Sequence, residues 1–206
     1  AHSMLMQSLK PDRVILWLGH GEQITAKLQK LSERGLEIKY TDDIKAYTKI
    51  IPTLINCSGS IAVTGDDDII YPKNWLQKLW LEHEEDPHAI CCHRAHLIIK
   101  DSPATVKPYD DWEWCITDTK LTPNIFPTGV GGVLYPPDSM DAEVIRRDIF
   151  QDLSPHNDDI WLKAMSLKKG TTCRIVRKKP LLIPLSVPST QTQGALRRIN
   201  IDENKN

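Results

Sequence analysis

Short apolar runs alternate with stretches of helical periodicity between residues 14 and 64, and this alternation constrains the fold more than any other feature. Three of the runs are too short for helices and predict strands: residues 14–18, 36–40 and 61–64. Between them, apolar residues recur at helical spacing up to Gly35 and again over residues 44–55, where Pro52 must kink the helix or end it early. A β-α-β-α-β order is typical of a largely parallel sheet with helices on both faces, so the sequence predicts an α/β fold.

Helix-start signals continue along the rest of the chain. Pro72 opens a helix at its first turn, and residues 140–150 predict a further short helix. The last predicted helix has Ser154 as its N-cap and Pro155 at its first position, and it ends at Gly170. These signals predict three helices after the third strand.

The same reading gives the remaining strands and the domain limits. Residues 89–99 and 171–176 predict two more strands, and no interdomain linker or internal repeat interrupts the pattern. We therefore expect one domain over residues 4–189 and a polar C-terminal tail over residues 190–206. Residues 1–3 have the composition of an expression scar.

Charge and cysteine content exclude several classes of protein. The chain holds 26 Lys and Arg against 27 Asp and Glu, a formal net charge of −1, which argues against binding nucleic acid by bulk electrostatics. No apolar run approaches the roughly 20 residues that span a bilayer. Five cysteines, an odd number without a C-x-x-C spacing, fit a reducing compartment. We expect a cytoplasmic protein whose membrane contact is limited to peripheral association with the inner face.

Asp66, Asp67 and Asp68 follow the third predicted strand directly. In a parallel sheet, ligands bind at the carboxyl ends of strands, where these residues would lie. Three adjacent carboxylates repel one another, and a divalent cation with hard oxygen ligands supplies the counter-charge. The alternative is a solvated acidic turn that precedes the helix at Pro72.

Four segments support a family resemblance by their order and spacing: Lys10-Pro11-Asp12, the stretch 66–79 that begins with three aspartates, the Gly-rich stretch 128–132 and the acidic pair within 157–163. Together they resemble family 2 glycosyltransferases of the GT-A fold and Asp-x-Asp type, and the resemblance covers roughly residues 8–180. The family's first β-α unit, which would precede the segment matching residues 8–11, is absent here. Either the sequence is a fragment of a longer chain, or it is a short relative whose contacts to the donor differ from those of the family.

The resemblance implies a fold and an activity. The fold is a three-layer sandwich with a mixed, mostly parallel central sheet. The activity is metal-dependent transfer of a sugar from a nucleotide-sugar donor, with UDP as the expected nucleotide, to a saccharide or lipid-linked acceptor in cell-surface polysaccharide biosynthesis. The cofactor is Mn²⁺ or Mg²⁺, which stabilises the departing diphosphate.

The resemblance and the local chemistry also imply roles for particular residues. The metal set is Asp66, Asp67, Asp68 and His156. Asp158 or Asp159 would act as general base, and the alternative is that they only complement the helix dipole. The donor set is Lys49, Arg94 and His96. Sugar or acceptor contacts fall to the rings of Trp112 and Trp114 and to the close approach that glycine allows at Gly131 and Gly132.

Two other functions remain open at this point. One is a different metal-dependent nucleotidyl or phosphoryl enzyme that uses the same aspartates, although Gly19-His20-Gly21-Glu22 is a poor phosphate loop. The other is a catalytically silent remnant of the fold that binds a carbohydrate or a nucleotide. Zinc at residues 91–96 is disfavoured, because His93 and His96 would point to opposite faces of a strand.

Overall fold

A four-stranded mixed sheet forms the centre of the fold in the computed structural model, which describes residues 1–118, 120–177 and 185–186. Its strands lie in the order β11 (Cys173–Ile175), β5 (Ile90–Cys92), β10 (Val133–Tyr135) and β3 (Ala62–Thr64). β11 is parallel to β5, whereas β10 is antiparallel to both of its neighbours. The predicted α/β class is confirmed.

The four-stranded sheet is mixed, as predicted: β3, β5 and β11 run in one direction and β10 runs against them. Parallel neighbours need a crossover connection, usually a helix. Between β5 and β10 the chain instead leaves the sheet through β6 (Ala95–Leu97) and returns through β9 (Ile125–Pro127), which pairs antiparallel with β6. β10 therefore enters the sheet in the opposite direction to β5.

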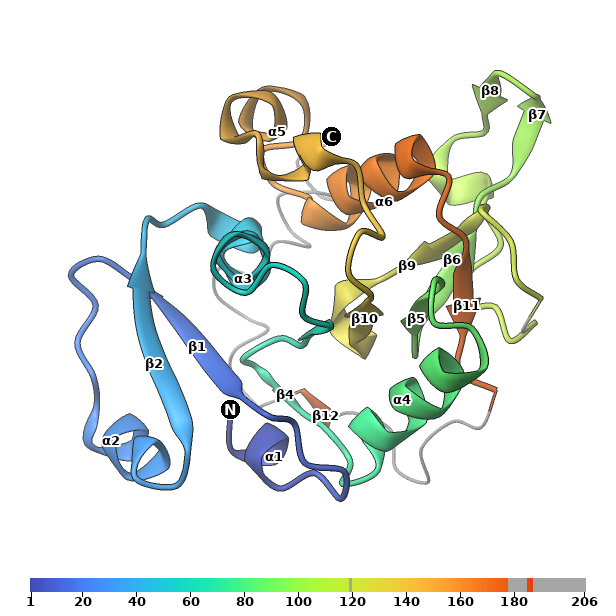
Figure 1. Cartoon of the computed structure of the whole chain (residues 1–206). Coiled ribbons are helices and arrows are strands. Elements are labelled where there is room, and N and C mark those ends of the chain that lie inside the picture. Colours follow the sequence, from blue (N-terminus) through green and yellow to red (C-terminus); the bar gives the residue numbers. More distant parts are fainter. Residues whose placement is uncertain (119, 178–184, 187–206) are drawn as a thin grey trace.

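A second, two-stranded parallel sheet holds the first two predicted strands. β1 (Val14–Gly19) pairs with β2 (Leu36–Thr41), and α2 (Ala26–Ser32) connects them. Gly35 has φ +100°, a conformation that glycine adopts without strain, and it turns the chain from α2 into β2. Among the described residues this sheet shares no ladder with the four-stranded one, and Figure 1 shows it beside the main body.

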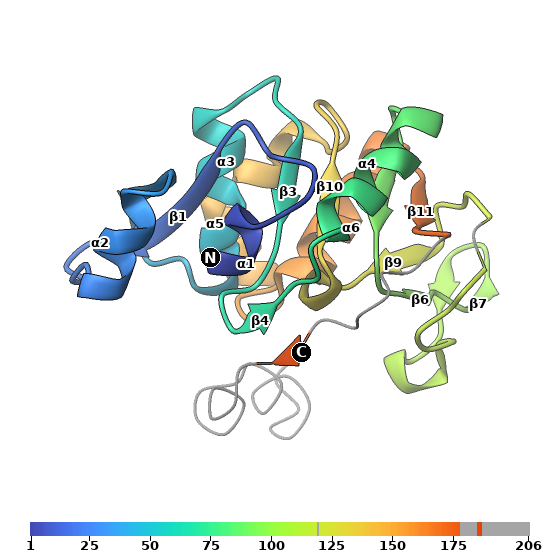
Figure 2. The ribbon, with the colours of Figure 1, turned by 90° about the horizontal axis from the view of Figure 1, so that it is seen from below.

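Helices cover both faces of the four-stranded sheet (Figure 2). On one face, Ile90, Val133 and Tyr135 pack with buried residues of α6 (Asp158–Lys169). On the other face, Cys91 and Leu134 pack with α4 (Trp75–Glu85). The period-2 alternation of strand side chains sorts neighbouring residues into these two cores.

Pro52 divides the predicted helix over residues 44–55, as expected. The first part is a 3₁₀-helix, η1 (Lys45–Lys49), and the second is α3 (Ile51–Asn56) with Pro52 in its first turn. The residue between them, Ile50, has φ −127° and is not helical. Lys49 consequently lies at the end of η1, next to a bend in the chain.

The remaining elements are short: α1 (His2–Leu5), β4 (Ile69–Ile70), β7 (Lys100–Ser102), β8 (Thr105–Val106), η2 (Tyr109–Asp111), η3 (Gly129–Gly131), η4 (Ala142–Ile145), α5 (Arg147–Leu153) and β12 (Leu185–Ser186). β4 pairs with β12, and β7 with β8.

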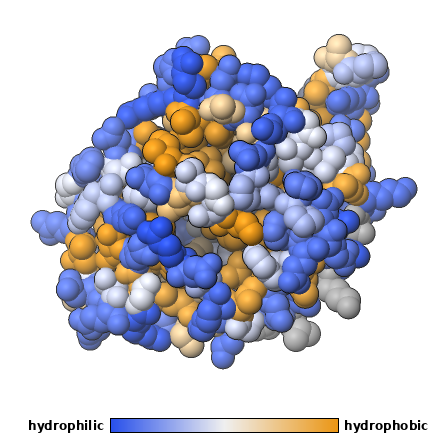
Figure 3. Space-filling view, viewed as in Figure 1, coloured by the Kyte–Doolittle hydropathy of each residue, from blue (hydrophilic) through white to orange (hydrophobic). Residues whose placement is uncertain are grey.

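Ser3, which the sequence predicts to be part of an expression scar, belongs to α1 and accepts a hydrogen bond from the Tyr71 amide. The predicted tail over residues 190–206 lies outside the described residues. Figure 3 shows an apolar patch over the region of α3 and α5.

Candidate active site

Three elements bring Lys49, Asp66 and Asp158 together. Asp66 lies between β3 and β4, Lys49 ends η1, and Asp158 begins α6. The Lys49 Nζ lies 3.1 Å from Asp66 Oδ1 and 3.2 Å from Asp158 Oδ2. One ammonium therefore joins a carboxylate at the end of a strand to a carboxylate in the first turn of a helix.

The position of α6 depends on contacts with η1. The Tyr47 hydroxyl donates a 2.6 Å hydrogen bond to the carbonyl of Ser154, and the Tyr47 ring stacks on Phe150 at 4.1 Å. The predicted start of this helix at Pro155 is wrong, because Asn157 is the N-cap and its side chain accepts a hydrogen bond from the Ile160 amide. The Ser154 hydroxyl instead donates to the carbonyl of Asn157. The later start places the acidic pair in the first turn, where the helix dipole favours negative charge.

Asp159 is held by the Gly-rich loop. The amide of Gly129 donates to both Oδ1 and Oδ2 of Asp159, at 3.1 and 3.0 Å. A Cβ atom at position 129 would lie 2.8 Å from Lys49 Nζ and 3.0 Å from Asp159 Oδ1. A larger residue at this position would therefore push aside the ends of two site side chains.

The two glycines predicted to contact a sugar have structural neighbours instead. A Cβ atom at Gly131 would lie 2.7 Å from Arg94 Cβ, and one at Gly132 would lie 2.2 Å from the Trp75 indole. The Trp75 Nε1 also donates to the carbonyl of Gly131 at 2.8 Å. Tight packing against Trp75 and Arg94 thus accounts for both residues.

Tyr71 fixes the loop that carries Asp66, Asp67 and Asp68, and the sequence did not indicate this role. Its hydroxyl accepts a hydrogen bond from the Asp66 amide at 2.9 Å and donates one to the carbonyl of Val130 at 3.1 Å. Burial raises the pKa of Tyr71, so the hydroxyl keeps its proton and can make both bonds. Asp67 is exposed, whereas Asp68 is partly buried, and burial followed by the charges of Asp66 and Asp67 raises the pKa of Asp68.

Charges within the site shift one another's pKa. Burial alone lowers the pKa of Lys49, but Asp158, Asp66 and Asp159 together raise it well above the usual range. Burial raises the pKa of Asp158, and Lys49 opposes this rise. Burial and then the Asp158 charge raise the pKa of Asp159 to about 7. A carboxyl group with that pKa can take up a proton near neutral pH, as a general base requires.

The raised pKa of Asp159 predicts a pH dependence of stability. In the folded state this carboxyl binds its proton up to about pH 7, whereas the ordinary value is 3.8. Asp159 consequently stabilises the fold most below pH 4, and this contribution is lost as the pH rises through 7. We expect Asp159→Asn to have a higher free energy of unfolding than the parent. This difference between the two proteins should be larger at pH 8 than at pH 5. Urea titrations at the two pH values measure this, and an equal difference at both would contradict the raised pKa.

Arg94 and His96, both predicted to bind the donor, have different surroundings. Arg94 borders the Gly-rich loop, and its Nη1 donates to Thr128 Oγ1 at 2.9 Å. His96 is fully buried, and its Nδ1 accepts a hydrogen bond from the Cys115 amide at 3.0 Å. Burial lowers the pKa of His96 to about 4. His96 is thus a neutral core residue at pH 7 and offers no charge to a diphosphate.

An aromatic cluster covers His96. Tyr109 contacts Trp112 at 5.1 Å and Trp114 at 4.9 Å between ring centroids, and Trp114 contacts His96 at 4.8 Å. The Trp112 Nε1 donates to the carbonyl of Lys107, which anchors the loop. Trp114 and Tyr109 are 44% and 40% exposed, so their rings offer apolar faces to a ligand. Tyr109 joins this cluster through η2.

The four predicted metal ligands do not form a preassembled site. No three His, Cys, Asp or Glu side chains in the described ranges gather where they could hold an ion, and His156 lies in the loop before α6. The charges nevertheless favour a cation, since the single ammonium of Lys49 faces Asp66, Asp158 and Asp159. Mg²⁺ is commonly bound by one or two carboxylates together with substrate phosphates. The aspartates present fit a cation that a bound diphosphate helps to hold.

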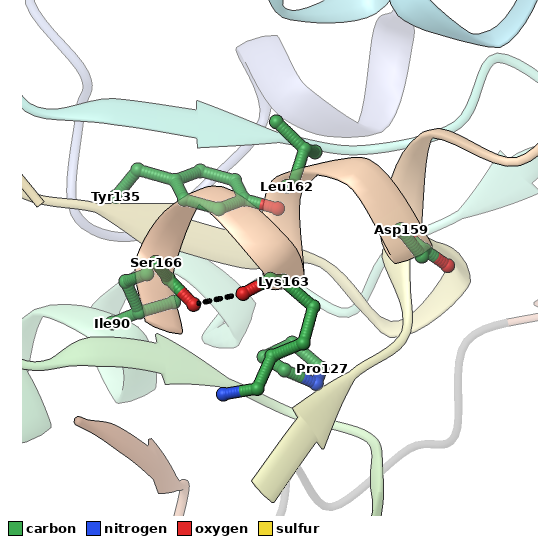
Figure 4. Close-up of a pocket in the computed structure, with 7 residues that line it drawn as sticks. All are labelled: Ile90, Pro127, Tyr135, Asp159, Leu162, Lys163 and Ser166. Carbon is green, nitrogen blue, oxygen red and sulfur yellow. Dashed lines mark hydrogen bonds between the residues drawn. The ribbon is translucent and has the colours of Figure 1, made fainter. Parts of the chain in front are cut away.

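Behind Asp159 lies a cavity of about 10 Å³ (Figure 4). Tyr135, Lys163 and Ser166 line it, and the Ser166 hydroxyl donates to the Lys163 carbonyl at 2.8 Å. Its volume is close to that of one water. A cavity of this size cannot hold a sugar.

No protein-family model matches this sequence, and a comparison with curated proteins finds no match. Within residues 1–118, 120–177 and 185–186, no helix is both long and apolar enough to cross a bilayer. The functional argument therefore depends on the geometry of the site.

Proposed function

We propose that this protein is a metal-dependent glycosyltransferase with a GT-A-like three-layer sandwich. The observation that carries the proposal is that Lys49 joins Asp66, at the end of a strand, to Asp158, in the first turn of α6, where the next residue, Asp159, accepts from the Gly129 amide. Glycosyl transfer needs a base for the acceptor hydroxyl and a counter-charge for the leaving diphosphate. Asp159 is available as the base, and Asp66, with Asp67 or Asp68, could hold the cation that supplies the counter-charge.

Asp159 is the proposed general base. The two hydrogen bonds from the Gly129 amide fix the plane of its carboxylate, and the start of α6 holds its backbone. Its pKa of about 7 lies near neutral pH, where a base combines availability with driving force. Asp158 is buried and paired with Lys49, so its task is to hold Lys49 and to raise the pKa of Asp159.

The nucleotide-sugar donor is proposed to bind through its diphosphate, with UDP as the nucleotide. Lys49 and Arg94 are the cations that border the Gly-rich loop. Asp66, with Asp67 or Asp68, would hold Mn²⁺ or Mg²⁺ against the diphosphate. When bound, such an ion neutralises charge that develops on the leaving group.

The acceptor is proposed to be a saccharide, free or lipid-linked, that stacks on the exposed faces of Trp114 and Tyr109. Burial raises the pKa of Tyr109, Arg94 opposes the rise, and the charge of Asp159 adds to it. The exposed rings are the proposed sugar-binding platform. Cell-surface polysaccharide assembly at the cytoplasmic face of a membrane is the process that we propose for it.

Binding of a nucleoside diphosphate tests the proposal. We expect UDP with Mn²⁺ to raise the melting temperature, because a ligand at 100 times its Kd adds about 2.7 kcal/mol to the free energy of unfolding. The Asp66→Asn variant should lose most of this shift, whereas Asp86→Asn, which changes a residue after α4, should keep it. Thermal denaturation with UDP, Mn²⁺ or both measures the effect.

Two outcomes of this experiment would argue against a glycosyltransferase. No shift with UDP, ADP or GDP in the presence of Mn²⁺ would contradict the proposal. A shift without any hydrolysis or transfer of the donor sugar would identify a silent binding protein instead of an enzyme.

A further inference from the structure

Lys49 occupies an unusual position for a lysine. Its ammonium lies between Asp66 Oδ1 and Asp158 Oδ2, at 3.1 and 3.2 Å, and its side chain is 25% exposed. Asp158 is only 5% exposed, so its Oδ2 has little contact with water. A buried carboxylate oxygen of this kind needs a cation, and the ammonium of Lys49 is the cation that faces it.

We infer that Lys49 is a positioning residue that makes metal binding conditional on the diphosphate. The inference rests on the proposed function and specifies how its site is regulated. Without donor, the ammonium pairs with Asp66, the carboxylate that would otherwise help to hold the divalent ion, and Asp158 keeps the ammonium there. With donor, the diphosphate attracts both the ammonium and the metal ion.

The physical basis is competition between cations for the same carboxylates. A divalent ion that reaches Asp66 alone must displace a 3.1 Å ion pair and approach a like charge. A diphosphate removes both obstacles, because its oxygens can pair with the ammonium and ligate the metal at once. The metal and the nucleotide should therefore bind with positive coupling, by equal factors in either order.

The first experiment titrates MnCl₂ alone into the parent and into Lys49→Gln, by calorimetry at pH 7.5. We expect Lys49→Gln to bind Mn²⁺ at least tenfold more tightly than the parent, because the competing ammonium is gone. Lys45→Gln is the matched control, since Lys45 lies four residues earlier and forms an exposed pair with Asp43. This control should bind Mn²⁺ as the parent does.

The second experiment guards against misfolding of Lys49→Gln, which leaves Asp158 buried without its cation. Asp158→Asn and the double variant Lys49→Gln/Asp158→Asn remove that buried charge. The double variant should still bind Mn²⁺ more tightly than Asp158→Asn, because Asp66 remains and is freed. Equal or weaker Mn²⁺ binding after loss of Lys49 in both backgrounds would overturn the inference.

Coupling to the nucleotide gives the third measurement. UDP should tighten Mn²⁺ binding at least tenfold in the parent and by a smaller factor in Lys49→Gln. An equal gain in both proteins would overturn the inference. Failure of the proposed function has a different signature, since a protein that binds no nucleotide could still show the effect of Lys49 on Mn²⁺ alone.

Discussion

Asp159→Asn is expected to lower kcat by a factor of about 10² to 10⁴ while UDP and Mn²⁺ bind nearly as in the parent. The asparagine keeps an oxygen for the Gly129 amide, so the loop and the start of α6 stay in place. What it loses is the ability to take a proton from the acceptor hydroxyl, and that step contributes only as the transition state forms. Calorimetry for binding and product formation for kcat separate the two effects.

Controls make this expectation specific. Asp152→Asn changes an exposed acid on α5 and should leave kcat unchanged. In the parent, kcat/KM should fall below about pH 7, where Asp159 becomes protonated. Loss of donor binding in Asp159→Asn together with loss of kcat would contradict the assignment, because it would show a structural or donor-holding role.

Gly132→Ala is expected to lower the free energy of unfolding by about 2–5 kcal/mol. A positive φ costs a residue with a Cβ roughly 1–2 kcal/mol, and overpacking a core adds about 1–3 kcal/mol. Gly132 has φ +94°, and its added Cβ would lie 2.2 Å from the Trp75 indole. The indole is 3% exposed and donates a hydrogen bond to Gly131, so it cannot move aside without losing that bond.

Gly59→Ala separates the two costs. Gly59 has φ +80° and nothing within 4 Å of its added Cβ, so only the backbone strain of roughly 1–2 kcal/mol applies. Urea titration of both variants gives the difference. Similar losses for the two variants would show that Trp75 can shift and that Gly132 is not required by packing.

Local patterns determined where many elements lie. The strand runs at 14–18 and 36–40 became β1 and β2, and Pro52 divided η1 from α3. The position of Asp66 between β3 and β4 was equally predictable. In each case the signal is carried by residues a few positions apart, whose preferences for strand, helix or turn do not depend on the rest of the chain.

Tertiary structure decided the direction of β10 and the burial of His96. The 89–99 run looked like one strand, but its second half pairs with β9 in a separate ladder, and the chain returns antiparallel. In this arrangement Trp114 and Tyr109 cover His96, and burial keeps the His96 ring neutral at pH 7. The neighbouring residues His93 and Arg94 did not indicate that burial. Strand partners are chosen by long-range packing and not by local propensity.

Local patterns were enough to predict an α/β chain with acidic residues at a strand end and near the start of a helix. They did not predict that Lys49 joins these acids, that Gly129 contacts Asp159, or that Tyr47 ties η1 to a loop 107 positions away. The physical reason is that such contacts depend on the relative placement of three elements. Loop closure and core packing set that placement, and no pattern within one segment encodes it.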